Sequence, residues 1–240
     1  MPVTPGHRAR LGFALLALLF ALLCVRLGFW QWHKGTQREA QWHSFARGSQ
    51  ARVSLGDAPL TSVPLYQRVS LSGVLDGTHQ FLLDNRPYQG RPGYEVLTPL
   101  RRAGGTTLLV DRGWVPFSGS RAQLPPVSVS AAAAVTLSGR VALLPSPGLA
   151  LGHAAPAGQW PKVTAFPTMD ELAGALGEAL EPRILWLDPE APQGYVRDWQ
   201  PPGMAPLRHF SYAIQWWSFA GLSVLLWALM ALRGRRGAPR

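Results

Sequence analysis

Two long apolar segments lie near the ends of the chain. Residues 11–25 are apolar without interruption, and the apolar character resumes after Arg26 and continues to residue 30. The whole stretch 11–30 has about the 20 residues that a helix needs to cross the hydrocarbon core of a bilayer. Residues 209–232 form a second stretch of this length, which is predominantly apolar from residue 210 onward. The pattern predicts two transmembrane helices.

A cleaved signal peptide is the alternative for the first segment, because a short basic region precedes a leucine-rich one. No A-x-A-like cleavage site follows it, and the segment ends instead in Arg26 and the aromatic residues Trp30 and Trp32. We therefore expect an uncleaved membrane anchor. The single cysteine, Cys24, lies within the apolar run, so the chain cannot form an intrachain disulfide.

Between the two segments, short alternating or apolar runs are separated by turn-forming Gly, Pro, Asn and Asp. Strands are predicted at residues 66–75, 79–83, 94–98, 106–110, 135–141 and 184–187. One helix is predicted after Thr168, because Glu171 stands at the capping-box position, and Pro182 is expected to end it. Residues 145–161 and 189–206 are expected to form loops. The pattern indicates an α+β, mainly antiparallel β domain with a barrel-like sheet.

The net charge of +10 first suggests a nucleic-acid partner, but its distribution argues against one. All 13 acidic residues lie between Glu39 and Asp198, where basic residues nearly balance them. Much of the excess is arginine flanking the two apolar segments, at positions 8, 10, 233, 235 and 236. By the positive-inside rule these arginines place both termini in the cytoplasm. We expect a bacterial plasma-membrane protein in contact with lipid, with a periplasmic domain and no nucleic-acid partner.

The predicted organisation has five parts, and its fold class is a membrane protein with two transmembrane helices flanking the mainly β domain. They are a cytoplasmic tail (1–10), a transmembrane helix (11–30), a periplasmic domain (31–208), a second transmembrane helix (209–232) and a basic cytoplasmic tail (233–240). No common catalytic motif is present, and the histidines lack metal-ligand spacing. Asp84 and Asp111 are interpreted as turn residues that follow strands. We do not expect an enzyme.

Polar residues are concentrated in the first half of the second apolar segment. Three of them, Ser211, Gln215 and Ser218, share one helical face, and His209, Tyr212 and Trp216 share a neighbouring one. Polar side chains at membrane depth normally face a partner helix, a cavity or a ligand. His209 is therefore a candidate metal ligand, the alternative being a histidine that extends to the membrane surface beside Arg208. The same two interpretations, ligand contact and membrane-surface residue, apply to Arg26.

Four motifs resemble the Surfeit locus protein 1 family. They are LGFWQ with a following lysine at residues 27–34, GYEVLTPL at 93–100, VDRGWVP at 110–116 and HFSYAIQWW at 209–217. Each resembles a family pattern, and together they occur in the family's order between two terminal spans. The sequence departs from the family at Asp111, where asparagine is usual, and more mildly at Lys34 and Trp217. Asp111 weakens any role that needs an amide donor at that position.

The resemblance implies a membrane-embedded assembly factor for haem–copper oxidases, chiefly cytochrome c oxidase. It implies that haem a binds at His209 and is placed in the main subunit of the oxidase, with that subunit or the haem a synthase as partner. The residues expected around the haem are Arg26, Trp30, His209, Tyr212, Gln215 and Trp216. A haem-independent scaffold that stabilises an assembly intermediate is the alternative. A periplasmic enzyme is a third, without a supporting cluster of acid, base and nucleophile.

Overall fold

The computed structural model describes residues 5–48, 51–105, 107–129, 134–145, 156–201 and 203–236, and side chains within residues 11–233. The chain divides into two compact units. One contains the two terminal segments, up to His43 and from Pro201 onward, and the other is a β domain from Ser44 to Gln200.

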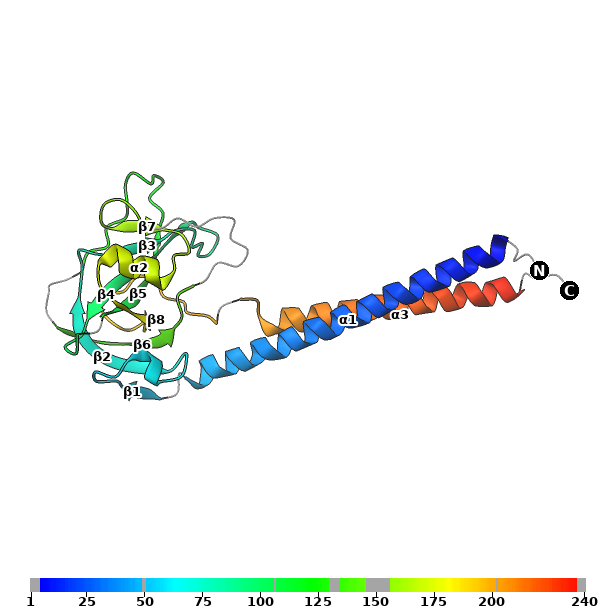
Figure 1. Ribbon diagram of the computed structural model, residues 1–240, viewed down its shortest axis with the longest axis horizontal. Helices are drawn as coiled ribbons and strands as arrows, with labels where there is room; N and C mark the ends of the chain where they lie inside the picture. The colour runs from blue at the N-terminus through cyan, green and yellow to red at the C-terminus, as the bar shows by residue number, and fades with distance from the viewer. Residues whose placement is uncertain are drawn as a thin grey trace. The chain divides into compact units, whose positions relative to one another are not determined.

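The helical unit consists of two long helices, α1 (Pro5–Arg47) and α3 (Pro206–Arg236), which run side by side in opposite directions (Figure 1). Both are long and apolar enough to cross a membrane. Only 17% and 11% of their most apolar windows are buried within the protein, which argues against core helices of a soluble protein. These helices indicate a membrane protein, as the hydrophobic pattern predicted.

Helix α1 continues well beyond the apolar run that ends at residue 30. Residues 31–47 contain no proline and only one glycine, and they are rich in Gln, Arg, Glu and Ala, which favour helices. The compact β unit starts at Ser44, inside the segment 31–208 that is predicted to lie in the periplasm. Helix α3 begins at Pro206, slightly before the expected residue 209, because proline is well tolerated in the first turn. Residues 1–4 and 237–240 of the two expected tails lie outside the described residues.

Eight strands among the described residues of the β domain form one sheet. They are β1 (Arg52–Ser54), β2 (Arg68–Leu75), β3 (Phe81–Leu83), β4 (Gly93–Arg101), β5 (Thr107–Pro116), β6 (Val135–Ala142), β7 (Lys162–Thr164) and β8 (Leu180–Leu187). Their order is β1-β2-β6-β8-β5-β4-β3-β7, and an additional β2–β4 pairing closes β2, β6, β8, β5 and β4 into a ring. Five pairings are antiparallel and three are parallel. The barrel-like sheet is confirmed.

Alternate residues of the ring strands build the main core. Leu71, Leu100, Val110, Leu137 and Leu185 belong to one buried cluster, to which the 3₁₀ turn Leu60–Ser62 adds Leu60. This arrangement follows from the two-residue period of a strand, which sends every second side chain to the same face.

Helix α2 (Met169–Leu176) covers a second cluster by burying Leu172. The predicted capping box is present, because Thr168 Oγ1 accepts from the Glu171 amide at 3.2 Å and the Glu171 carboxylate accepts from the Thr168 amide at 2.7 Å. The helix ends at Gly177, which has φ +80°, and not at Pro182, which lies within β8. Glycine adopts this left-handed conformation without the strain of a Cβ atom, so it terminates the helix first.

Two further expectations for the β domain concern the end of β5 and the loop after β6. Strand β5 does not end at Asp111 but continues to Pro116. Gly113 has φ +104° within the strand, and Trp114 donates its amide to Val196 O at 2.8 Å, so a later segment pairs with this part of β5. Of the expected loop 145–161, residues 146–155 lie outside the described residues.

Candidate cofactor site between the two long helices

Small residues at regular spacing bring α1 and α3 into contact. Ala21 and Cys24 are buried against Ala220, and Gly28 and Gly35 are buried further along the same face of α1. Their spacing of three, four and seven residues is that of a left-handed helix pair. Small side chains let membrane helices approach closely.

Two aromatic side chains of α3 fill the space that the glycines leave. A Cβ atom on Gly35 would lie 2.6 Å from the ring of Phe210, and one on Gly28 would overlap the ring of Trp217. Trp32 packs on both rings, with centroids at 4.8 Å from Phe210 and 5.7 Å from Trp217. The result is an aromatic cluster on either side of residue 31.

His209 and Gln31 meet within this cluster. The Nδ1 atom of His209 lies 2.8 Å from Gln31 Oε1, so with the oxygen in this place Nδ1 carries the proton and donates it. The Nε2 atom of His209 is buried and has no hydrogen-bond partner. Buried polar atoms are nearly always paired. An imidazole with Nδ1–H engaged and Nε2 unprotonated is the form that coordinates a metal through Nε2.

Trp216, Tyr212 and Gln215 lie progressively further around α3 from the contact between His209 and Gln31. Trp216 is half-buried and packs against the Ala21, Cys24 and Ala220 cluster. Tyr212 is 42% exposed at the edge of the helix contact, and Gln215 is exposed.

The polar face that the sequence singled out on α3 points away from α1. Ser211 and Ser218 are exposed, and their hydroxyls donate to Leu207 O and Ile214 O, each at 2.9 Å. Both bonds are to the carbonyl four residues earlier on the same helix, which satisfies the hydroxyl without a partner helix or ligand. Within the described structure, this face contributes nothing to the contact around His209.

Arg26 and Trp30 lie on the other side of α1. Arg26 is two residues, or about 200° of helical turn, from both Cys24 and Gly28, and therefore points away from α3. It lines an open groove of about 760 Å³ together with Trp30 and His33. The structure thus does not bring Arg26 and Trp30 together with His209. It places them beside a different histidine, which the sequence had not suggested as a candidate.

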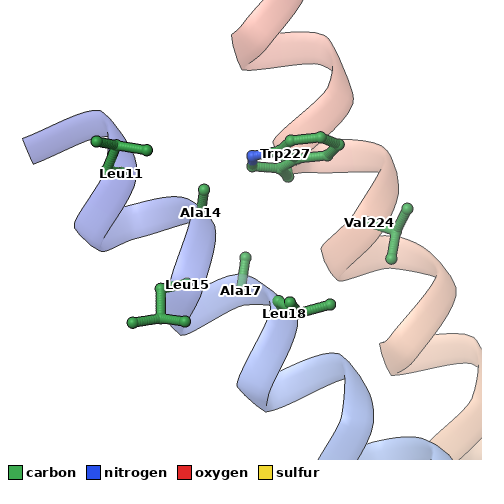
Figure 2. Close-up of a pocket in the computed structure, with 7 residues that line it drawn as sticks. All are labelled: Leu11, Ala14, Leu15, Ala17, Leu18, Val224 and Trp227. Carbon is green, nitrogen blue, oxygen red and sulfur yellow. The ribbon is translucent and has the colours of Figure 1, made fainter. Parts of the chain in front are cut away.

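A separate apolar cavity of about 410 Å³ lies between the helices near the chain ends (Figure 2). Trp227 of α3 projects towards Ala14 and Ala17 of α1, and the other lining side chains are also hydrocarbon. Sites that fix a ligand need a few polar groups to orient it. This cavity supplies almost none, so we do not assign it a ligand.

In the β domain, Asp111 and Arg112 do not act as an acid–cation pair. Successive side chains of β5 point to opposite faces, and Arg112 is buried among carbonyl oxygens, donating to Ser128 O and Gln193 O at 2.9 and 2.5 Å. Burial lowers the pKa of the Arg112 guanidinium, which has no carboxylate partner among the described residues. Arg112 therefore fixes two loops to the barrel.

Asp84 remains a turn residue, as predicted. It follows β3, its Oδ1 accepts from the Asn85 amide at 2.7 Å, and its Oδ2 pairs with exposed Arg121. Among the described residues, no group of three or more His, Cys, Asp or Glu side chains could hold a metal ion.

Comparison with known proteins decides the family, because residues 18–221 of this chain match the sequence model that defines the SURF1 family. The chain belongs to the SURF1 family. Uncharacterized SURF1-like proteins of Mycobacterium bovis and of two strains of Mycobacterium tuberculosis are 30% identical to it over 245 aligned residues. Each alignment covers 94% of this chain and 86% of the relative. The family resemblance inferred from the four motifs is confirmed.

The SURF1 family is a family of assembly factors associated with cytochrome c oxidase and is not known as an enzyme family. The residues that sequence reasoning missed in this SURF1-family chain are Gln31, Gly28 and Gly35. Gln31 stood in the first motif without an assigned role. The signal that could have identified the two glycines is their place in a repeat of small residues on α1, at positions 21, 24, 28 and 35. Gln31 lies between the two glycines in the same seven-residue register.

Proposed function

We propose that this chain is an assembly factor for cytochrome c oxidase that binds haem a through His209 Nε2. In this proposal it helps to place haem a in the main subunit of the oxidase. The observation that carries the proposal is the buried Nε2 atom without a partner, on a ring whose Nδ1 is engaged by Gln31. Histidine is a common axial ligand of haem iron.

The chain's own groups would act by holding the ligand and shielding it. Gln31 Oε1 accepts from Nδ1–H, which keeps the lone pair on Nε2 available and fixes the plane of the ring. The rings of Phe210, Trp32 and Trp217 add apolar surface along the same helix contact. Because Nε2 is buried, coordination requires movement of the side chains that cover it. The haem supplies the iron and a large apolar surface.

The test compares the absorption spectra of wild type, His209→Ala and His33→Ala, each purified in detergent from cells that make haem a. Loss of the haem spectrum in His209→Ala alone supports ligation by His209. His33 is the matched control, because it is exposed on the face of α1 that carries Arg26 and Trp30. Loss in His33→Ala with full occupancy in His209→Ala would move the site to that groove and refute the proposal.

A haem-independent scaffold is the second candidate function. It is favoured by the separation of Arg26 and Trp30 from His209, which leaves the expected haem surroundings incomplete on this helix pair. Wild-type protein that contains no haem but co-purifies with the main oxidase subunit or the haem a synthase would support this function. Retained oxidase assembly in His209→Ala cells would support it further.

We also propose that both termini are cytoplasmic, with the β domain in the periplasm of a bacterial plasma membrane. The arginines flanking the two spans support this orientation. A Glu190→Cys variant, in a chain with Cys24→Ala, provides a single thiol at a side chain that is 80% exposed. A membrane-impermeant maleimide should label this thiol in intact spheroplasts. Labelling only after the cells are lysed would reverse the orientation.

A further inference from the structure

A polar pocket in the β domain has no role in the proposed haem site. It has a volume of about 290 Å³ and lies where the β3–β4 loop, β4, β5 and the segment before α3 meet. Its main lining side chains are Arg86, Tyr88, Glu95, Trp114, Asp198 and Trp199. The second and third family-like motifs contribute Glu95 and Trp114 to it. The volume is at the lower end of the range for small-ligand sites.

Unpartnered polar atoms are concentrated at this pocket. Among the described residues, eight buried side-chain nitrogen or oxygen atoms lack a hydrogen-bond partner, and five belong to one neighbourhood. They are Arg86 Nε and Nη2, Glu95 Oε2, Asp111 Oδ2 and Trp186 Nε1. Asp111 and Trp186 are register neighbours on β5 and β8, and the Trp186 ring stacks on that of Trp199. Arg86 and Glu95 line the pocket itself, so their unpartnered atoms are available there to water or to a ligand.

Three carboxyl groups and one guanidinium lie in or beside this pocket. Arg86 Nε lies 3.2 Å from Glu95 Oε2, although the two are not oriented for a hydrogen bond. Burial raises the pKa of Glu95 and Arg86 only partly opposes this, while burial and the Glu95 charge raise the pKa of Asp111. Asp198 adds a third carboxyl group at an exposed position. Burial thus disfavours the charged forms of Glu95 and Asp111, and a neighbouring cation would favour them.

We propose that this pocket binds an organic cation, a guanidinium or primary ammonium group, between Glu95 and the aromatic side chains. The cation would donate to Glu95 Oε2, which lies 3.2 Å from Arg86 Nε without accepting a hydrogen bond from it, and would favour the charged form of this carboxyl group. The aromatic walls are suited to it: the rings of Tyr88 and Trp114 have centroids 5.4 Å apart, and Trp199 lies on the same pocket. Cations are attracted to the faces of such rings.

Other ligand classes fit this pocket less well. An anion would bring a further negative charge next to Glu95 and Asp111. A bare metal ion lacks a group of three suitable ligands among the described residues. The guanidinium carbon of Arg86 lies 5.1 Å from the centroid of the Phe166 ring, so Arg86 already makes a cation–π contact with that ring. The cation can be a free small molecule or the side chain of a protein partner, since the chemistry of recognition is the same.

Calorimetric titration of the full chain in detergent tests the proposal. The probes are methylguanidinium, ethylammonium, N-methylurea as a neutral analogue, and two short peptides that differ only by Arg or Gln at the centre. Saturable binding of the cations or of the Arg peptide, without binding of N-methylurea or the Gln peptide, supports the proposal. Binding of the Arg peptide alone identifies a partner's side chain as the source.

Two variants and one control locate the binding. Glu95→Gln should weaken binding at least tenfold, and Asp198→Asn, at an exposed position that folding tolerates, should weaken it severalfold. Glu190→Gln, at an exposed acid outside the pocket, should leave it unchanged. Absence of saturable binding, equal binding of N-methylurea, or unchanged binding in both pocket variants would overturn the proposal and leave ordered water as the occupant. The pocket shares no residue with the His209 site, so neither result affects the other proposal.

Discussion

Replacing Gln31 by leucine removes the acceptor of the His209 Nδ1–H bond with little change in side-chain volume. The bond, at 2.8 Å, joins residues 178 positions apart in the sequence. Hydrogen bonds between membrane helices contribute on average only about 0.6 kcal/mol to helix association. Loss of the outer partner of a metal-bound histidine typically lowers metal affinity about 10–100-fold, or about 1.4–2.8 kcal/mol. We therefore expect Gln31→Leu to weaken haem binding far more than it weakens the helix pair.

The assay is a titration of haem-free protein in detergent with haem a, followed by the absorbance of the bound haem. Gln31→Glu keeps an acceptor at the same position and should retain most of the affinity. Gln37→Leu is the matched control, because Gln37 is exposed on α1. Nitrogen-15 spectra of His209 should in addition show protonation at Nδ1 in wild type and a mixture of tautomers in Gln31→Leu.

Two results would refute this reasoning. The first is an affinity of Gln31→Leu within about twofold of wild type, which lies below the effect of losing an outer partner. The second is a loss of helix pairing in Gln31→Leu as large as its loss of haem affinity, since Gln31 would then act on the helices and not on the imidazole.

Three further predictions concern packing, charge and helix capping. Gly28→Leu overlaps Trp217 and should destabilise the helix pair by about 1–3 kcal/mol, measured by unfolding in SDS. Asp111→Asn removes a carboxyl group whose pKa is raised by burial and by Glu95. Because such a group destabilises the folded state as pH rises above its unfolded pKa, the gain in thermal stability should be larger at pH 8.5 than at pH 5. Thr168→Ala should cost about 1 kcal/mol and lower the melting temperature by about 2–4 °C.

The sequence predicts correctly those elements that depend on neighbouring residues alone. The two spans follow from the length of their apolar runs, and the start of α2 follows from the Thr168–Glu171 capping box. The continuation of β5 through Gly113 could not be predicted in this way. The D-R-G sequence is typical of a turn, but a distant segment at Val196 pairs with Trp114 and holds Gly113 at φ +104° within the strand. Tertiary pairing overrides the local preference there.

The polar face of α3 and its contact with α1 lie on different sides of the helix. Polar residues on a membrane helix normally mark a face turned to a partner helix, a cavity or a ligand, which on α3 is the face of Ser211, Gln215 and Ser218. The serine hydroxyls instead bond to their own helix, and the contact face is set by glycine on α1 and aromatic rings on α3. The repeat of small residues can mark the contact face of α1, but which aromatic rings of α3 fill it is a property of the pair.

The four family-like motifs correspond to two physical contacts. The first and last motifs meet between α1 and α3, where Gly28 lies against Trp217 and Gln31 bonds to His209.

The two middle motifs meet as neighbouring antiparallel strands, with Tyr94 opposite Val115 and Thr98 opposite Val110. A change in one member of each pair therefore alters the environment of the other. If haem binding is the reason for the first contact, Gln31 and His209 variants should be non-additive: with His209→Ala present, Gln31→Leu should cause no further loss of haem binding. An additive double variant would mean that the two residues act separately, despite their hydrogen bond.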